Sequence, residues 1–271
     1  MAILADCHLH THFSADSEAS MEDMILAGID AGLNTMCFTE HNDFDMPELP
    51  DFPTEAWELN TDSYLYELLQ YKEKYADRIR ILFGVEIGFQ ESCVRKDAVF
   101  AKSHEFDFII GSTHIVRGMD PYYPEYFEGR DPEDAYHEYF ENELINIKKH
   151  SNFDVYGHLD YVVRYCNKNG TYDYARHAEL FDEILKTLLD KEKGIELNTK
   201  GMTKGMKEFN PCMSILKRYR ELGGEIITIG SDAHAPSGVG LHFEKACEVL
   251  KEAGFKYYSI FEKRNPEFHR L

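Results

Sequence analysis

Short apolar runs alternate with longer amphipathic segments along the whole chain, and this alternation restricts the possible folds. The runs are rich in β-branched and aromatic residues and are bounded by Gly, Asp or Asn, which is typical of buried parallel strands. They cover residues 2–7, 34–39, 79–85, 106–112, 153–157, 194–198 and 225–230, with a further candidate at 256–261.

The segments between the runs carry apolar residues at helical spacing, most clearly over 20–33, 61–77, 132–150, 175–193 and 211–223. Ser20 and Asp23 are spaced as in a capping box at the start of the first segment. Strands that alternate with helices predict an α/β fold with a mainly parallel sheet. Seven or eight such units in 271 residues favour a closed barrel over an open sheet.

The domain organisation is simple. We find no linker, low-complexity tract or internal repeat, so we expect one domain over residues 1–271. The irregular segments 42–60 and 117–131 are predicted to be loops over one face of the barrel.

Each of the seven runs ends in a polar residue type that is rarely buried. Because the carboxyl ends of parallel barrel strands share one rim, these side chains are expected to meet there. A lone histidine at a strand end is more often structural, but a succession of such ends favours a common site. The residues at these ends are His8, His10, Glu40, His41, Glu86, His114, His158, Asp160, Asn198, Asp232 and His234.

Histidine and carboxylate side chains together, without cysteine in matching positions, suit zinc, iron or manganese at a hydrolytic centre. His8 and His10 alternate on one face of the first run and can chelate one ion, whereas Cys7 faces the other way. About nine candidate ligands favour two or three ions that share a bridging carboxylate. Closely spaced ions activate water and hold a phosphoryl group during displacement.

The charge and cysteine content narrow the choice of partners. A formal net charge of −20 repels nucleic-acid phosphates, and bound cations would supply the positive field that an anionic substrate needs. Six cysteines without a Cys-x-x-Cys pair, and no leader-like start, indicate a reduced cytoplasmic protein. No apolar run approaches the roughly 20 residues that span a membrane. We therefore predict a small-molecule substrate, and the oligomeric state stays open.

Six motifs carry a specific family resemblance: HLHTHFSAD, TEHND, GVEIG, GSTH, GHLD and GSDAH, in this order from residue 8 to residue 234. The sequence resembles the PHP (polymerase and histidinol phosphatase) superfamily. The stretches IIGSTHIVRGMD, GHLDYVVRY and IELNTKGMTK are similar to its histidinol-phosphate phosphatases. The resemblance implies a distorted (β/α)7 TIM-like barrel, a trinuclear centre of zinc, manganese or iron, and hydrolysis of L-histidinol phosphate in histidine biosynthesis.

The resemblance also implies which residues hold the three ions, with Glu86 as the catalytic bridge between two of them. The first ion would be held by His8, His10, Glu86 and Asp232, the second by Glu86, His114 and His158, and the third by Asp16, His41 and His234. The turn with Thr203 and Lys204 departs from the pattern, since the phosphatases often carry an Arg there.

Further residues are candidates for proton transfer and substrate contact. Asp160 is the candidate acid or orienting group, because it follows His158 by two positions. Candidate contacts to phosphate or the rest of the substrate are Arg117, Arg164, Lys204 and Asn42, with Glu40 and Asp43 as further partners for a substrate cation.

Two alternatives to this function remain open. One is another PHP activity: a phosphodiesterase, an exonuclease-like enzyme or a protein-tyrosine phosphatase. A nuclease usually shows a basic track, and the net charge of −20 opposes this. The other is a non-catalytic metal-binding module, in which the ion coordination would be closed.

Overall fold

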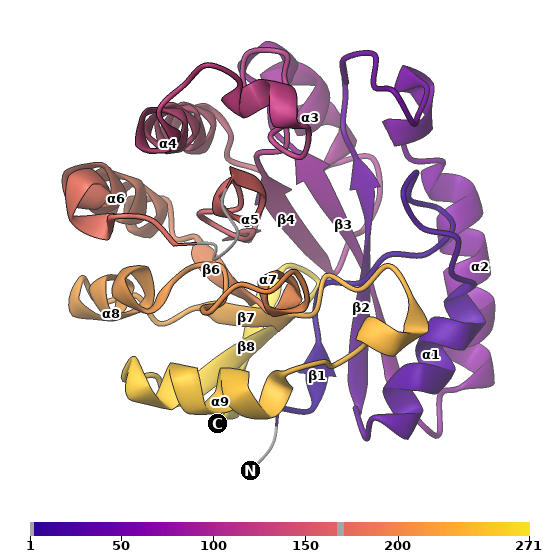
Figure 1. The fold of residues 1–271 in the computed structure, drawn as a ribbon. Helices are drawn as coiled ribbons and strands as arrows, with labels where there is room; N and C mark the ends of the chain where they lie inside the picture. Colours follow the sequence, from indigo (N-terminus) through magenta and orange to yellow (C-terminus); the bar gives the residue numbers. More distant parts are fainter. Residues whose placement is uncertain (1–2, 167–170) are drawn as a thin grey trace.

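The computed structural model describes residues 3–166 and 171–271, and seven parallel strands form its centre (Figure 1). In space they follow their order in the chain. They are β1 Ala5–Asp6, β2 Thr35–Asn42, β3 Arg80–Gly88, β4 Phe108–Ser112, β5 Val155–Tyr156, β6 Gly194–Asn198 and β7 Ile227–Gly230. Each of the seven predicted runs overlaps one of these strands, and β2 and β3 extend beyond the ends of their runs.

The barrel closes between the first and last strands. Leu9, beyond the end of β1, pairs in parallel with Ala233, beyond the end of β7. The backbone N–H of Cys7 donates to the Ile229 carbonyl at 2.9 Å, and that of His10 donates to Ala233 at 3.0 Å. The ring is irregular because β1 and β5 are only two residues long. The predicted distorted (β/α)7 barrel is confirmed.

Helices surround the strands in Figure 1. The five predicted helical segments correspond to α1 Met21–Asp30, α2 Thr61–Lys74, α4 Pro132–Lys149, α6 Tyr174–Asp190 and α8 Met213–Glu221. The others are α3 Val94–Phe100, α5 Val163–Cys166, α7 Lys200–Thr203 and α9 Phe243–Glu252. The predicted cap of α1 is present: Ser20 Oγ accepts from Asp23 N at 3.1 Å and donates to Asp23 Oδ2 at 2.7 Å.

The apolar run 256–261 forms a strand outside the barrel. It corresponds to β8 Tyr257–Glu262, which pairs antiparallel with β9 Asn265–Arg270. Arg264, in the turn between them, donates through Nε to Asp154 Oδ2 at 2.5 Å, just before β5 begins. This hairpin therefore packs at the amino ends of the strands and leaves the opposite rim open.

The two predicted loops both contribute residues to a pocket at the carboxyl ends of the strands. The first follows β2 and contains the short 3-10 helix η1 Thr54–Trp57, and the second contains η3 Pro124–Phe127. Met46 and Trp57 of the first loop form a small apolar cluster with Ile115. Among the described residues, no helix is both long and apolar enough to cross the bilayer.

Candidate metal centre

Glu86 lies at the centre of the predicted ligands and is fully buried at the end of β3. Five imidazole nitrogens lie within 3.5 Å of its two carboxylate oxygens. Those nearest Oε2 are His8 Nε2 at 3.1 Å, His41 Nδ1 at 3.2 Å and His10 Nε2 at 3.5 Å; those nearest Oε1 are His158 Nε2 at 2.8 Å and His114 Nε2 at 3.3 Å. One carboxylate thus faces five imidazoles from four different segments of the barrel rim.

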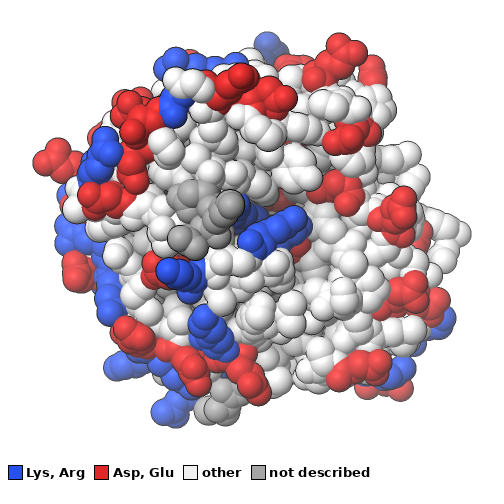
Figure 2. All heavy atoms as spheres, viewed as in Figure 1, with Lys and Arg blue, Asp and Glu red and all other residues white. Residues whose placement is uncertain are grey.

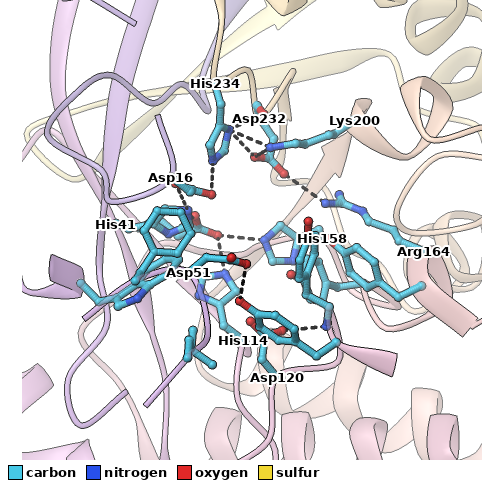
Figure 3. Close-up of a pocket in the computed structure, with 18 of the residues that line it drawn as sticks. Asp16, His41, Asp51, His114, Asp120, His158, Arg164, Lys200, Asp232 and His234 are labelled. Carbon is cyan, nitrogen blue, oxygen red and sulfur yellow. Dashed lines mark hydrogen bonds and ion pairs between the residues drawn. The ribbon is translucent and has the colours of Figure 1, made fainter. Parts of the chain in front are cut away.

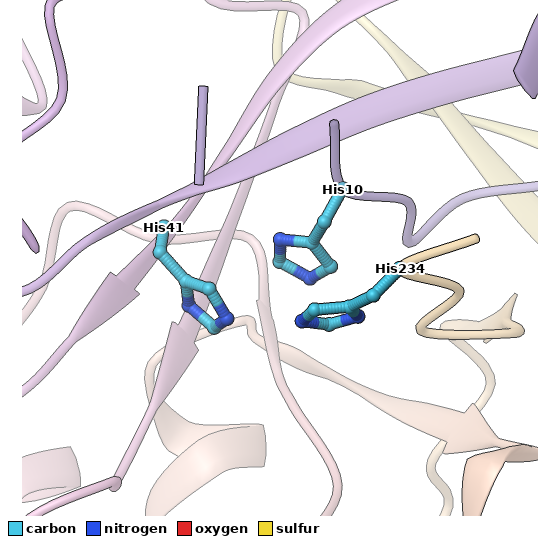
Figure 4. Close-up of side chains that lie close together, drawn as sticks. All are labelled: His10, His41 and His234. Atoms are coloured by element: carbon cyan, nitrogen blue, oxygen red, sulfur yellow. The ribbon is translucent and has the colours of Figure 1, made fainter. Parts of the chain in front are cut away.

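The remaining predicted ligands lie on the side of the centre nearest β7 (Figure 3). Asp16 Oδ2 is 2.8 Å from His234 Nε2, and Asp16 Oδ1 is 3.8 Å from His41 Nε2. The His10 ring lies between those of His41 and His234, with ring centroids 4.2 Å from each (Figure 4). Asp232 Oδ1 is 3.7 Å from His10 Nε2.

Three groups of these residues bring their ligand atoms within 4.8 Å of one another, which is close enough to share an ion. The groups are His8–His10–Asp232, His41–Glu86–His114 and His10–His41–His234. The buried Nε2 atom of His10 makes no hydrogen bond. A buried polar atom of this kind normally has a partner, and a lone pair aimed at carboxylates is suited to a cation. The donor set therefore fits divalent metal ions.

Backbone geometry helps to turn the ligands inward at the strand ends. His158 and Asp232 have φ values of 23° and 53°, in the left-handed region that residues other than glycine rarely occupy. Gly88 leaves room for a further carboxylate: a Cβ there would lie 1.6 Å from Asp43 Oδ1. Gly88, the second glycine of GVEIG, thus allows Asp43 to approach the centre.

Two histidines are oriented by carboxylates behind them. His8 Nδ1 is 2.6 Å from Glu196 Oε1, and His114 Nδ1 is 2.6 Å from Asp43 Oδ1. Each ring therefore turns its Nε2 towards Glu86, an arrangement typical of metal-binding histidines. Glu196 was not among the predicted site residues. Its signal was an acidic residue in the middle of the buried run GIELN.

Opposite charges stabilise one another within the centre. Burial opposes ionisation of Glu86, but the imidazoles of His8, His114 and His41 lower its pKa well below the usual range. Burial likewise opposes ionisation of Asp232, but Lys200, His8 and Arg164 lower its pKa. Burial lowers the pKa of His10, and the neighbouring His234 and His41 lower it further. His10 is therefore neutral, the form that binds a metal.

The pocket above the centre has a basic side and an acidic side (Figure 3). Arg164 and Lys200 line it near Asp232, and Asp51 and Asp120 line it from the two long loops. Lys204 also lines the pocket. Figure 2 shows Lys or Arg side chains at the hollow in the middle of this face. Arg164 and Lys204, two of the predicted substrate contacts, therefore line this pocket, and their contact with a substrate stays a prediction.

Lys200 was not predicted to belong to the site. Its Nζ lies 3.1 Å from Asp232 Oδ1 and 2.7 Å from His234 Nδ1. Lys200 follows the polar end of the sixth apolar run by two residues, and this position was the available signal.

The structure contradicts the predicted proton-transfer role of Asp160. Its φ of 65° turns the chain, and the side chain does not line the pocket. Asp160 Oδ1 accepts from Asn210 Nδ2 at 2.6 Å, and Oδ2 accepts from the backbone of Cys212 at 3.0 Å and from the Tyr172 hydroxyl at 3.2 Å. Burial raises the pKa of Asp160 to about 7. Its carboxyl group holds the 210–212 segment in place.

Two predicted substrate contacts also lie outside the pocket. The Arg117 side chain is 71% exposed, and its Nη1 lies 2.8 Å from Glu138 Oε1 on α4. The backbone at Arg117 has a positive φ of 50°, which turns the loop outward. Asn42 is buried, and its Oδ1 accepts from the backbone of Leu59 at 3.1 Å. Neither residue is among those that line the pocket.

Comparisons with known proteins agree with the geometry. The PHP domain family model matches residues 6–200. A protein of Clostridium acetobutylicum named probable histidinol-phosphatase is 34% identical over 96% of this chain and 97% of its own length. The histidinol-phosphatase of Lactococcus lactis is also 34% identical, over 94% of this chain and 93% of its own length.

A solved structure shares the whole fold. The crystal structure of histidinol phosphate phosphatase from Lactococcus lactis, complexed with zinc, L-histidinol and phosphate, superposes with a TM-score of 0.87. Its sequence is 32% identical, and the match covers 97% of this chain and 98% of that one. Together with the barrel and the rim of histidines and carboxylates, these matches show that the chain belongs to the PHP domain family and, within it, to the histidinol-phosphatases.

Proposed function

We propose that residues 1–271 act as a single PHP metallophosphoesterase domain that hydrolyses L-histidinol phosphate to L-histidinol and phosphate. The observation that carries the proposal is the convergence of predicted ligands on Glu86, at the base of a pocket with a basic and an acidic side. The Lactococcus lactis structure with zinc, L-histidinol and phosphate supports it.

The proposed cofactors are two to three divalent ions of zinc, manganese or iron. Ions in such positions neutralise phosphoryl oxygens and lower the pKa of water. The proposed ligands are His8, His10, Glu86 and Asp232 for the first ion, Glu86, His114 and His158 for the second, and Asp16, His41 and His234 for the third.

The basic side of the pocket suits the phosphate group. Arg164 is buried, and three of its side-chain N–H groups donate to Asn210, Asp232 and Asn198. A guanidinium has five N–H groups, so two remain for phosphate oxygens as far as the described residues are concerned. Lys200 and Lys204 line the same side and add positive charge. These residues would hold the phosphate next to Asp232 and the ions.

The acidic side suits the ammonium and imidazole groups of histidinol. Asp120 Oδ1 accepts from the backbone of Tyr122 at 2.8 Å, and Asp51 Oδ2 accepts from the Tyr123 hydroxyl at 3.2 Å. Burial raises the pKa of Asp120 to about 6, which leaves it mostly ionised at pH 7. Within residues 3–166 and 171–271, neither carboxylate forms an ion pair. Both are therefore available to a cationic substrate.

The direct test is turnover of purified, zinc-supplemented protein on three substrates: histidinol phosphate, phosphotyrosine and a nucleoside cyclic phosphate. We expect histidinol phosphate to give the highest kcat/KM, measured by phosphate release. Faster turnover of phosphotyrosine or of the cyclic diester would favour another PHP activity. No turnover of any of the three would favour a non-catalytic metal-binding module.

Replacing Asp120 with Asn should reduce selectivity for a cationic substrate. A hydrogen bond to a charged group contributes about 1.5–3 kcal/mol, so kcat/KM for histidinol phosphate should fall by about 10- to 100-fold. Phenyl phosphate carries no cation, and its kcat/KM should stay within about twofold. The measurement is the ratio of the two kcat/KM values in each protein. An equal loss on both substrates would place Asp120 in the support of the loop instead.

A further inference from the structure

Glu40 is fully buried at the end of β2 and does not line the pocket, so it cannot contact a substrate bound there. Its carboxylate instead accepts three hydrogen bonds from the loop after β1. The Thr11 hydroxyl donates to Oε1 at 2.7 Å, the Ser14 hydroxyl donates to Oε2 at 2.6 Å, and the Thr11 backbone N–H donates to Oε2 at 2.9 Å. This arrangement differs from the predicted role of Glu40 as a substrate contact.

The directions of these hydrogen bonds are determined by the groups around the two hydroxyls. The backbone N–H of Phe13 donates to Thr11 Oγ1 at 3.4 Å, and that of His41 donates to Ser14 Oγ at 3.0 Å. A backbone N–H can only donate, so each hydroxyl oxygen accepts in that contact. An ionised carboxylate can only accept, so each hydroxyl donates its own hydrogen to Glu40.

The Ser14 oxygen also lies 3.0 Å from His10 Nδ1. The only hydrogen of the Ser14 hydroxyl is already directed to Glu40, so His10 Nδ1 must carry the hydrogen in this contact. A neutral imidazole protonated at Nδ1 has its lone pair on Nε2. His10 Nε2 points to the centre, 3.5 Å from Glu86 Oε2 and 3.7 Å from Asp232 Oδ1.

We propose that Glu40 is a positioning residue that acts through Ser14 to hold His10 in its Nδ1–H form, with Nε2 free to bind the first metal ion. His8 and His114 receive the same orientation from direct contacts with Glu196 and Asp43, whereas at His10 a serine hydroxyl connects the carboxylate to the ring. The proposal rests on the proposed metal centre but not on the identity of the substrate.

The first test is the zinc affinity of Glu40→Gln, measured by competition with a chromophoric chelator. Glutamine keeps the size of Glu40 but replaces one carboxylate oxygen with an NH2 group. This NH2 group faces either Ser14 or Thr11, whose hydroxyls donate to Glu40 in the wild type. When the NH2 faces Ser14, the serine hydrogen turns towards His10 and favours the form with hydrogen on Nε2. We expect zinc to bind about 10- to 100-fold more weakly, as is typical when the support of a ligand is lost.

Glu143→Gln is the matched control. Glu143 is also fully buried, its two oxygens make no hydrogen bond within the described chain, and burial raises its pKa well above the usual range. The same substitution there should leave zinc affinity unchanged. Because zinc affinity is measured without turnover, the result is independent of whether histidinol phosphate is the substrate.

The second test is a double-mutant cycle with Ser14→Ala. Since Glu40 is proposed to act only through Ser14, Glu40→Gln should weaken zinc binding in the wild type and have little further effect in Ser14→Ala. In ¹H–¹⁵N spectra of the zinc-loaded protein, the His10 Nδ1–H signal should shift in Glu40→Gln, broaden in Ser14→Ala and stay unchanged in Glu143→Gln.

Three results would overturn the proposal: wild-type zinc affinity in both Glu40→Gln and Ser14→Ala, fully additive losses in the double mutant, or a zinc-loaded wild type without the His10 Nδ1–H signal. If Glu40→Gln fails to fold, the zinc affinity of Ser14→Ala alone tests the proposal. Wild-type zinc affinity in Ser14→Ala would then refute the role of the hydroxyl.

Discussion

Glu86→Gln is expected to lower kcat for histidinol phosphate by about 10³-fold or more and to release part of the bound metal. Glu86 is fully buried, and five imidazole nitrogens lie within 3.5 Å of its oxygens. In the proposed centre its carboxylate is shared by two ions. A neutral amide removes that negative charge and points an NH2 group at the ligands. A loss of about 4 kcal/mol of charge stabilisation corresponds to about 10³ in rate.

The measurement combines kcat at saturating substrate with the zinc content per chain of the same samples. Wild type treated with a chelator gives the reference for complete loss, and Glu143→Gln controls for the same change at another buried glutamate. We expect two to three ions in the wild type and fewer in Glu86→Gln. If Glu86→Gln retained both its metal content and its rate, the assignment of Glu86 as the shared ligand would be wrong.

The position of the centre could be predicted because a parallel barrel brings all carboxyl strand ends to one rim. The prediction needed only the approximate end of each apolar run, and an error of three residues at the ends of β2 and β3 did not change which rim a ligand reached. His41, Glu86 and His114 were found in this way, although their strands contact one another only after the chain has folded.

The direction of an individual side chain beyond a strand end could not be predicted in the same way. Asp160 was expected to face the rim because the chain was assumed to stay extended after His158. The positive φ values at both residues turn the chain, and the partners of Asp160 come from positions 210 and 212. The spacing of residues around His158 shows neither this turn nor contacts with residues 50 and 52 positions later in the chain.

Residues on the loops were also difficult to assign. The segment 117–131 was predicted to be a loop over one face of the barrel, but Arg117 points to solvent while Asp120, three residues later, lines the pocket. The buried supports Glu40 and Glu196 were misread or missed for a related reason. A carboxylate that orients a histidine resembles, in sequence, one that contacts a ligand.

Arg164→Met is the second substitution from which we expect a large effect. The guanidinium donates from Nε to Asn210 Oδ1 at 2.7 Å, from Nη2 to Asn198 Oδ1 at 2.8 Å and from Nη1 to Asp232 Oδ2 at 3.2 Å. Burial opposes its charge, but Asp232 raises the pKa of Arg164, so the group stays protonated. Methionine fills a similar volume without any donor. Loss of a preorganised donor to phosphate should lower kcat/KM by about 10²- to 10³-fold.

Arg164→Met should also lower the free energy of unfolding, because the buried carboxylate of Asp232 loses its ion pair with Arg164. Breaking such a pair typically costs about 3–5 kcal/mol. Since Lys200 and Asn198 still contact Asp232, we expect the lower end of that range. Thermal melts of the metal-free protein would measure it. The matched control is Arg218→Met. Arg218 on α8 forms a bidentate ion pair with Asp182 on α6, and neither residue lines the pocket.

Arg164→Lys separates the contribution of charge from that of geometry. Lysine keeps the positive charge but cannot hold Asn198, Asn210 and Asp232 at once with the planar fork of a guanidinium. If Arg164 binds phosphate through its two remaining N–H groups, Arg164→Lys should recover only part of the kcat/KM lost in Arg164→Met. Equal values for wild type and Arg164→Lys would mean that the positive charge alone is sufficient. If folded Arg164→Met retained kcat/KM within about threefold of wild type, Arg164 would have no part in binding the phosphate.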